Sequence, residues 1–300
     1  MPTPVGKKRN SAHAAGDFSS DDAPPPVVLI TGASSGFGEA CAQRLGTKGY
    51  CVYGTSRRAI WNPAPKRDSP GNSTFQMIPM DVCDTASVDA GVDTILKTSG
   101  RIDVVVCNAG FGLAGSVEDS TVEEAKRQFE TNFFGIWRVC RAVLPHLRRQ
   151  KSGYLVIVGS LAGVMGIPFQ AAYSASKFAL EGLAEALRME VKPWGVQVVL
   201  IQPGDFHTGF TRNRIKSAAS RTNPDYAATF ARALAVMEKD ERQGPSPDHL
   251  ARLVERIITH PAPRLRYTAG TMSQRVGALL KRVLPGRHIE WHMMATYKLN

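Results

Sequence analysis

The stretch VVLITGASSGFGEACAQRLGTKG, Val27–Gly49, carries the clearest structural signal in this 300-residue chain. It opens with a run of Val, Leu, Ile and Thr, which is typical of a strand buried on both faces of a parallel sheet. Glycines at 32, 36 and 38 follow at once, and the remainder predicts a helix that ends at Gly49. Such a turn lets the backbone approach a phosphate, and the first N–H groups of the helix then face the anion. The stretch therefore predicts a dinucleotide site, although an ordinary strand–helix turn can also carry three glycines.

Strand-like runs alternate with helical segments through the rest of the chain. Further strands are predicted in CVYGTS, FQMIPMDV, IDVVVCNAG, YLVIVG and VQVVLIQPG, which begin at residues 51, 75, 102, 154 and 196. Pro79 is expected to shorten the third strand. Helices are expected over 86–98 and 121–150 and from Tyr173 onward. This order predicts an α/β fold: one doubly wound, Rossmann-type parallel sheet with helices on both faces, in a single domain over residues 27–270.

The two ends of the chain are expected to lie outside this domain. Residues 1–26 are rich in Pro, Ser, Ala and Asp, and they predict a disordered tail without the apolar run of a signal peptide. Residues 271–300 predict a basic amphipathic extension, with Met272, Val276, Leu279 and Val283 on one face. A helix of this kind can rest on a membrane surface, and more often it packs on its own domain.

Composition narrows the function classes. The chain has 37 basic and 26 acidic residues, but no block of five basic residues, so nucleic-acid binding is not expected. Apolar runs stay well short of the ~20 residues of a membrane-spanning helix. The five cysteines have no CxxC spacing, and they favour buried free thiols in a reducing compartment over a metal site. We therefore expect a cytoplasmic protein, with membrane association through the C-terminal extension as the alternative.

Three side chains suited to proton transfer lie between Gly159 and Gly182. Tyr173 and Lys177 are four residues apart, so they share one face of a helix. Ser160 follows the run YLVIVG, at the sheet edge where open α/β folds bind their ligands. The positive charges of Lys177 and of an oxidised nicotinamide ring are together expected to lower the pKa of Tyr173 toward the range useful for proton transfer. Taken singly, each residue is equally typical of a surface pair or a turn.

Together these motifs resemble the short-chain dehydrogenase/reductase family, in its hydroxysteroid and retinol dehydrogenase-like subgroup. The spacing TGxxxGxG of Thr31–Gly38 begins the resemblance, and the other family positions follow in order up to Thr208. The resemblance implies that Tyr173 is the general acid/base, that Ser160 orients the substrate oxygen, and that Asn132 supports a water linking Lys177 to solvent. One departure is Cys107, where many members have a second Asn.

The resemblance also implies which residues hold the cofactor. They are Gly32, Ser34, Ser35, Gly36, Phe37, Gly38, Asp81, Val82, Asn108, Ala109, Gly110, Tyr173, Lys177, Pro203, Gly204 and Thr208.

The end of the second predicted strand bears on the choice of cofactor. NAD-preferring enzymes place an acidic residue there, which would repel a 2′-phosphate. This chain has Ser56 and Arg57 instead, and an arginine offers two parallel hydrogen bonds to a phosphate. We therefore expect NADP(H), while a pair of solvated arginines in a loop is the alternative for Arg57 and Arg58.

Apolar residues surround the expected substrate site. They are Phe111, Leu113, Met165, Ile167, Pro168, Phe169, Phe206 and Phe210, although several could belong to the core. Residues 205–247 are expected to form a lid. The overall prediction is an NADP(H)-dependent oxidoreductase that interconverts a carbonyl and an alcohol on a steroid, a retinoid or a long-chain carbonyl compound. The alternative is a non-catalytic NADP(H)-binding regulatory or scaffold protein.

The helix predicted for residues 121–150 bears on assembly. Its apolar residues recur every three or four positions and predict one stripe, formed by Phe129, Phe133, Trp137, Cys140, Leu144 and Leu147. This helix and the Tyr173 helix each have an apolar face that another surface must bury, and members of the family pair these helices between subunits. The resemblance therefore implies a homodimer or homotetramer.

Overall fold

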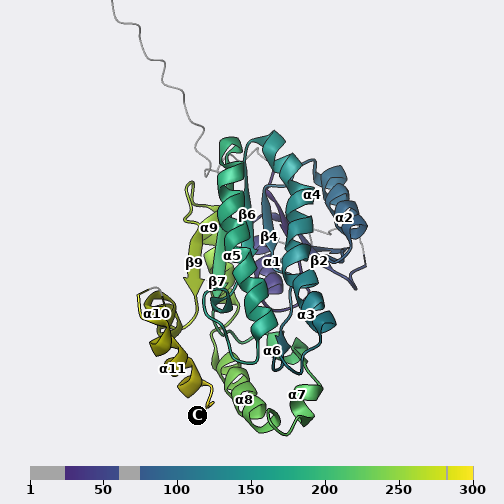
Figure 1. Ribbon diagram of the computed structural model, residues 1–300. Coiled ribbons are helices and arrows are strands. Elements are labelled where there is room, and N and C mark those ends of the chain that lie inside the picture. The colour runs from purple at the N-terminus through teal and green to yellow at the C-terminus, as the bar shows by residue number, and fades with distance from the viewer. Residues whose placement is uncertain (1–23, 61–74, 282, 300) are drawn as a thin grey trace, which may run out of the picture.

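The computed structural model describes residues 24–60, 75–281 and 283–299. At its centre is a seven-stranded sheet in the order β3-β2-β1-β4-β6-β7-β9, in which every pair is parallel (Figure 1). The strands are β1 (Val27–Ile30), β2 (Cys51–Ser56), β3 (Gln76–Pro79), β4 (Val104–Cys107), β6 (Gly153–Val158), β7 (Val196–Pro203) and β9 (Arg266–Ala269). The predicted doubly wound parallel sheet is confirmed, and its third strand ends at Pro79 as expected.

Helices cover both faces of the sheet. One layer consists of α2 (Thr85–Ser99), α4 (Gly135–Gln150) and α5 (Ala171–Val191), and the other of α1 (Gly36–Thr47) and α9 (Asp248–Ile258). Successive residues of β1 point to opposite layers: Leu29 packs in the first core, Val28 and Ile30 in the second. Both faces are buried, which explains the uninterrupted apolar run at the start of the domain.

The helix predicted for residues 121–150 is divided. It consists of α3 (Val122–Phe129), a π-helix (Glu130–Phe134) and α4. The wider turn shifts the helical register, so the expected single apolar stripe is wrong. Leu147 is fully buried, whereas Trp137 is 50% exposed.

A strand and a small sheet near the substrate side were not predicted. Strand β9, RYTA, joins the edge of the main sheet, and its half-buried residues form no apolar run. Strands β5 (Leu113–Ala114) and β8 (Ile215–Lys216) form a separate two-stranded sheet. This pairing ties the chain after β4 to the segment 205–247, which also contains α6 (Phe210–Asn213), α7 (Ala219–Thr222) and α8 (Ala227–Gln243).

The C-terminal extension folds into α10 (Met272–Leu280) and α11 (Gly286–Thr296). Figure 1 shows α10 beside β9 and α11 beside α8. Hydrogen bonds support both placements: Gln274 bonds with Asp205, and Arg232 Nε of α8 donates to the Lys298 carbonyl at 3.3 Å. Residues 1–23 of the expected tail and 61–74 of the loop after β2 lie outside the described residues.

Candidate active site

The sheet order reverses between β1 and β4, and the segments that follow these strands are locked together. The Thr31 hydroxyl accepts hydrogen bonds from the backbone N–H groups of Asn108 and Ala109, both at 3.0 Å. The Asn108 amide donates to the carbonyl oxygens of Thr31 and Gly32 at 2.9 and 3.1 Å. In open α/β sheets, ligands bind in the crevice at this switch point.

The glycine turn after β1 has the shape of a phosphate cradle. Gly32 and Gly36 have φ values of +67° and +60°, which favour glycine. A Cβ on Gly38 would lie 2.4 Å from the Gly32 carbonyl oxygen and 2.6 Å from the Asn108 amide nitrogen. Within the described residues, the side chain of Ser35, the N-cap of α1, forms no capping hydrogen bond, so it does not compete for the first N–H groups of the helix. These residues fit the diphosphate of a dinucleotide.

The remaining predicted residues of the turn differ in exposure. Ser34 and Ser35 are exposed, and Phe37 packs edge-on against Phe206 with ring centroids 5.0 Å apart. A Cβ on Gly110 would lie 3.0 Å from Asn132 Oδ1, so this loop also passes close to the π-helix.

The ends of β2 and β3 lie at the same edge of the sheet as the glycine turn. The Ala33 N–H donates to the Thr55 carbonyl at 2.9 Å, which places Ser56 and the exposed Arg57 next to this turn. After β3, Asp81 Oδ1 accepts a hydrogen bond from the Cys83 N–H at 3.0 Å, and Val82 is buried.

The segment after β7 closes the other end of the cradle. Pro203 ends the strand, and the Gly204 N–H donates to the Ala269 carbonyl at 2.7 Å. A Cβ on Gly36 would lie 3.4 Å from Thr208 Cβ, so Thr208 packs over the glycine turn. Residues predicted for the two ends of the cofactor thus meet across one crevice.

Ser160, Tyr173 and Lys177 come together beyond the end of β6. Ser160 is the N-cap of the short 3₁₀ helix Leu161–Gly163, and Tyr173 and Lys177 are both buried on α5. Lys177 Nζ donates to the Val158 carbonyl at 2.9 Å and lies 5.8 Å from the centroid of the Tyr173 ring. The predicted hydroxyl, phenol and ammonium therefore share one site.

Burial sets the acidity of these groups. Burial raises the pKa of Tyr173 to about 12, because removing the phenolate from water disfavours ionisation more than the hydrogen bond with Ser160 favours it. Glu241 and Asp205 add to this rise in pKa, and Arg214 opposes it. Burial also lowers the pKa of Lys177 to about 8. The lowering expected from Lys177 together with an oxidised nicotinamide ring stays a prediction, because burial raises the pKa of Tyr173 in the protein alone. With this raised pKa the phenol keeps its proton at neutral pH, which is the state that can donate a proton.

Asn132 lies fully buried in the π-helix. Its amide bonds to both backbone groups of Phe111, with Oδ1 accepting from the N–H at 3.1 Å and Nδ2 donating to the carbonyl at 3.0 Å. Nδ2 also lies 3.3 Å from the hydroxyl of Ser176, the neighbour of Lys177. Asn132 therefore connects the loop after β4 to α5, and its expected support of a water stays a prediction.

The predicted apolar wall is divided between pocket and core. Phe210 lies against Tyr173, with 5.6 Å between the ring centroids. Phe169 packs on Phe230, at 5.4 Å between centroids. Leu113 and Phe206 are buried, and Phe206 belongs to the core under α1 and α9.

Sequence reasoning missed a charged group beside Tyr173, made of Asp205, Arg214 and Glu241. These residues are far apart in the sequence and belong to no motif. Only the charges themselves, in a segment otherwise expected to cover an apolar substrate, could have drawn attention to them.

Comparisons with known proteins agree with this geometry. A family model described as short chain dehydrogenase matches residues 26–219. A 3-ketodihydrosphingosine reductase from Bacteroides thetaiotaomicron is 42% identical over 275 residues, which cover 92% of this chain and 99% of that protein. The 17-beta-hydroxysteroid dehydrogenase type 1 of Homo sapiens is 36% identical over 253 residues, which cover 80% of this chain and 76% of that protein.

A solved structure is also similar. A short-chain dehydrogenase from Streptomyces avermitilis has a TM-score of 0.73 and 32% identity, covering 90% of this chain and 97% of that one. The chain therefore belongs to the short-chain dehydrogenase/reductase family and resembles its hydroxysteroid and retinol dehydrogenases, oxidoreductases that interconvert CH–OH and C=O groups with a nicotinamide dinucleotide.

Proposed function

We propose that this protein is an NADP(H)-dependent reductase of a lipophilic ketone, and that 3-ketodihydrosphingosine represents its substrate class. The observation that carries the proposal is the buried Tyr173 hydrogen-bonded with Ser160 next to the glycine turn, where burial raises the pKa of the phenol to about 12. A protonated phenol suits reduction, because the carbonyl oxygen must gain a proton as it becomes an alcohol.

Each residue of the site has a distinct task in this reaction. When bound, the cofactor supplies a hydride to the carbonyl carbon. Ser160 donates a hydrogen bond that holds the carbonyl oxygen, and Tyr173 gives this oxygen its proton. Lys177 places a positive charge near the phenol and so stabilises the phenolate that remains.

The preference for NADP(H) follows from the end of β2. Ser56 and Arg57 offer a hydroxyl and a guanidinium where an acidic residue would favour NAD. Arg57 is exposed and forms no ion pair within the described residues, so its guanidinium is available to a 2′-phosphate.

The choice of substrate class rests on coverage and on the pocket. The 3-ketodihydrosphingosine reductase matches this chain over nearly its whole length, whereas the steroid dehydrogenase is matched over 76% of its own. Phe169, Phe210 and Phe230 give the site an apolar side that fits an alkyl chain.

A panel of ketones tests this function. Purified protein is given NADPH or NADH with 3-ketodihydrosphingosine, a steroid ketone or retinaldehyde, and the loss of reduced cofactor is followed by absorbance. We expect the fastest loss with NADPH and the long-chain ketone. Turnover of the steroid alone would reject the substrate class, and faster turnover with NADH would reject the cofactor preference.

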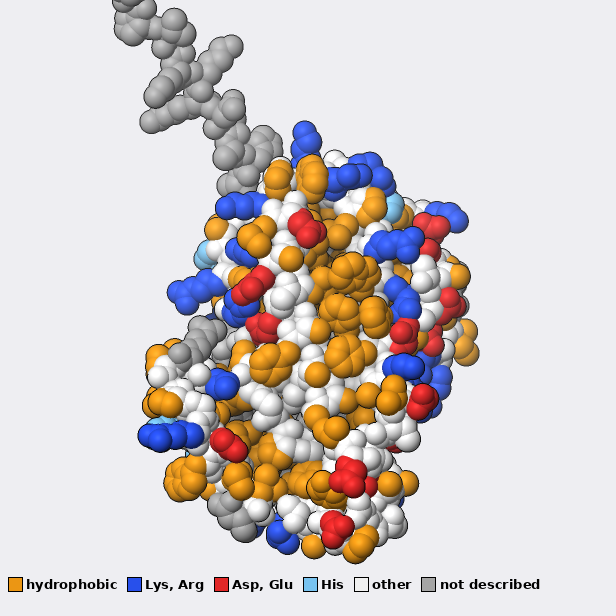
Figure 2. Space-filling model, viewed as in Figure 1, with side chains coloured by type: hydrophobic (Ala, Val, Ile, Leu, Met, Phe, Trp, Pro, Cys, Tyr) orange, Lys and Arg blue, Asp and Glu red, His pale blue; other side chains and the backbone are white. Residues whose placement is uncertain are grey.

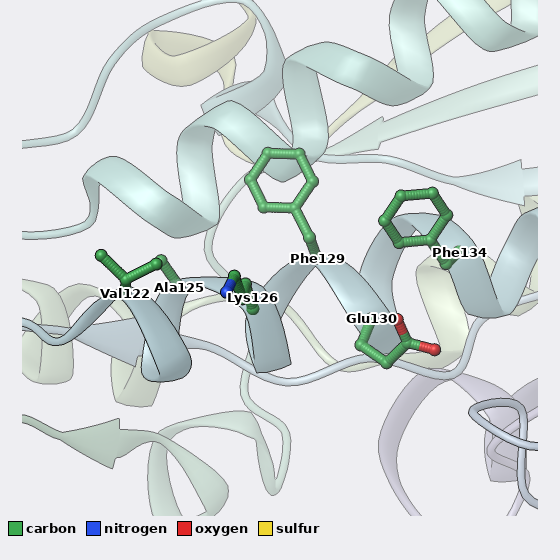
Figure 3. Close-up of a pocket in the computed structure, with 6 residues that line it drawn as sticks. All are labelled: Val122, Ala125, Lys126, Phe129, Glu130 and Phe134. Carbon is green, nitrogen blue, oxygen red and sulfur yellow. The ribbon is translucent and has the colours of Figure 1, made fainter.

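We also propose that a second copy of the chain covers the face formed by α3, α4 and α5. Hydrophobic side chains gather over α4 and α5 in Figure 2, where Phe134, Trp137 and Phe178 are 46%, 50% and 45% exposed. The patch continues into a groove on α3 and the π-helix (Figure 3), lined by Val122, Ala125, Lys126, Phe129, Glu130 and Phe134. Exposed apolar surface of this kind marks an interface, and two identical patches can cover each other about a twofold axis.

Light scattering after size-exclusion chromatography tests this assembly. We expect a dimer or tetramer for the wild type and a monomer for Trp137→Glu combined with Phe178→Glu. A monomeric wild type would contradict the proposal.

The C-terminal extension is our proposed site of peripheral contact with anionic membranes. Met272, Val276, Leu279 and Leu280 of α10 are exposed rather than packed on the domain, and Arg275 is exposed among them. No helix in the described parts of the chain could cross a bilayer. We expect wild type to float with phosphatidylserine vesicles, and Val276→Glu with Leu279→Glu to remain in the soluble fraction. Equal flotation of both would reject this contact.

A further inference from the structure

Charged side chains are buried next to the catalytic tyrosine. The side chain of Arg214 is fully buried and forms an ion pair with Glu241 of α8. The second oxygen of Glu241 accepts a hydrogen bond from the Thr211 hydroxyl at 2.6 Å. Burying charges costs free energy unless their hydrogen bonds are satisfied, so a fold does not place them in an apolar region without compensation.

This charged group lies one aromatic ring away from Tyr173. The guanidinium carbon of Arg214 is 5.5 Å from the centroid of the Phe210 ring, whose other neighbour is Tyr173 at 5.6 Å. Asp205 lies at the end of α8 that carries Glu241, because a Cβ on Gly244, the C-cap of this helix, would lie 2.5 Å from the Asp205 carbonyl oxygen. The charges of Glu241, Arg214 and Asp205 also act on the pKa of Tyr173.

Part of the hydrogen-bonding capacity of this group is unused. Arg214 Nε and Nη1 are buried and have no partner within the described residues. Asp205 Oδ2 accepts a hydrogen bond from Gln274 Nε2 at 2.5 Å. Asp205 Oδ1 has no hydrogen-bond partner within the described residues. Two donors and one acceptor therefore remain for a ligand with polar groups of both kinds.

The net charge of the group favours a cation. Asp205, Asp240 and Glu241 all raise the pKa of Tyr297, which enters from the C-terminal extension, while Arg214 opposes them. These three carboxyl groups outnumber the one guanidinium, and burial, followed by the charges of Glu241 and Asp240, raises the pKa of Asp205 to about 7. A ligand with an ammonium group would offset this excess, and an apolar ligand would leave it uncompensated.

We propose that Asp205 and Arg214 form a subsite for the polar head of an amino ketone, with the substrate ammonium on Asp205 Oδ1 and the substrate hydroxyl on the Arg214 guanidinium. This subsite rests on the proposed function, because 3-ketodihydrosphingosine carries an amino group on the carbon next to its ketone and a hydroxyl on the carbon after that. The head lies against the charged group, and the alkyl chain extends along the aromatic side of the pocket.

Substrate selectivity tests the subsite. The kcat/KM for 3-ketodihydrosphingosine is divided by that for an unsubstituted 3-ketone of the same chain length, in the wild type and in Asp205→Asn. The asparagine keeps the size of the side chain and can still accept the Gln274 bond. We expect this ratio to fall by at least about tenfold, the usual loss for a hydrogen bond to a charged group.

Glu238→Gln is the matched control, because it removes the same charge from α8 at a residue that pairs with Lys216 at the surface. Its ratio is expected to stay within about twofold of wild type, within the usual range for a surface substitution. An Asp205→Asn ratio equal to that of the control would overturn the subsite.

A binding measurement separates this proposal from the proposed function. Dihydrosphingosine is expected to raise the Tm of the wild type more than that of Asp205→Asn, and a deaminated long-chain alcohol is expected to affect both alike. If no ketone is reduced but this difference in Tm appears, the reductase function fails and the subsite stands. If ketones are reduced but dihydrosphingosine stabilises both proteins equally, the subsite fails alone.

Discussion

The nucleotide cradle and the substrate side of the crevice are built in different ways. The cradle consists of backbone and small residues: Gly38 has no room for a Cβ, and Asn108 ties the turn after β1 to β4. The substrate side consists of side chains from separate segments, such as Phe210, Arg214 and Asp205. A site formed by the backbone tolerates few substitutions. A site formed by side chains can be altered to bind another ligand while the fold stays the same.

Tyr173→Phe should have the largest effect, because Tyr173 is where the two sides meet. Without the phenolic proton we expect kcat to fall about 100- to 10,000-fold, the usual contribution of a general acid. NADPH binding, measured by fluorescence titration, should change little because the cradle is untouched. Tyr154→Phe, which removes a hydroxyl bonded to the His260 carbonyl, is the control and should keep its activity. Activity retained in Tyr173→Phe would contradict the role of Tyr173 as the proton donor.

Gly38→Ala should damage the cradle without touching the substrate side. The added Cβ would lie 2.4 Å from a carbonyl oxygen, and overpacking of this kind costs about 1–3 kcal/mol of stability. We expect NADPH binding to be lost and the free energy of unfolding to fall, as measured by titration and urea denaturation. Gly277→Ala is the control, since nothing lies within 4 Å of its Cβ and α10 lies outside the proposed interface, and it should stabilise α10 by up to about 1 kcal/mol. Normal NADPH affinity in Gly38→Ala would contradict the cradle.

The contrast between the cradle and the substrate side also explains which features could be predicted from the sequence. The glycine spacing, the buried strands and the Ser160–Tyr173–Lys177 set were predictable, because each follows from local chain geometry or from a motif. Strand β9 was not, because its residues become a strand only by pairing with β7. The π-helix at Asn132 and the group of Asp205, Arg214 and Glu241 also depend on tertiary contacts that no local pattern encodes. The rise in the pKa of Tyr173 likewise comes from burial, which no local pattern encodes.

Arg57→Ala should have a smaller effect, confined to one part of the cradle. We expect the preference for NADPH over NADH, measured as a ratio of dissociation constants, to fall about tenfold, because one charge-assisted hydrogen bond is lost. Arg58→Ala, an exposed neighbour, is the control. An unchanged ratio in Arg57→Ala would assign that residue to the solvated loop.

The change of kcat/KM with pH should be the smallest of these effects. Lys177 is protonated below its pKa of about 8, while Tyr173 keeps its proton up to about 12. The kcat/KM for reduction should therefore be level at lower pH and decline as the pH rises through about 8, because the charge near the phenol is lost. NADPH binding is measured at each pH to separate this decline from loss of the cofactor. A level profile up to about pH 10 would remove Lys177 from the mechanism.

Transfer of a labelled hydride tests the central claim most directly. The protein is incubated with 3-ketodihydrosphingosine and NADPH in which both hydrogens at nicotinamide C4 are deuterium, and the product is analysed by mass spectrometry. We predict dihydrosphingosine with deuterium on the former carbonyl carbon, formed about 100- to 10,000-fold more slowly by Tyr173→Phe. Tight NADPH binding without a deuterated product from this or any other ketone of the panel would contradict the account and indicate a non-catalytic binding protein.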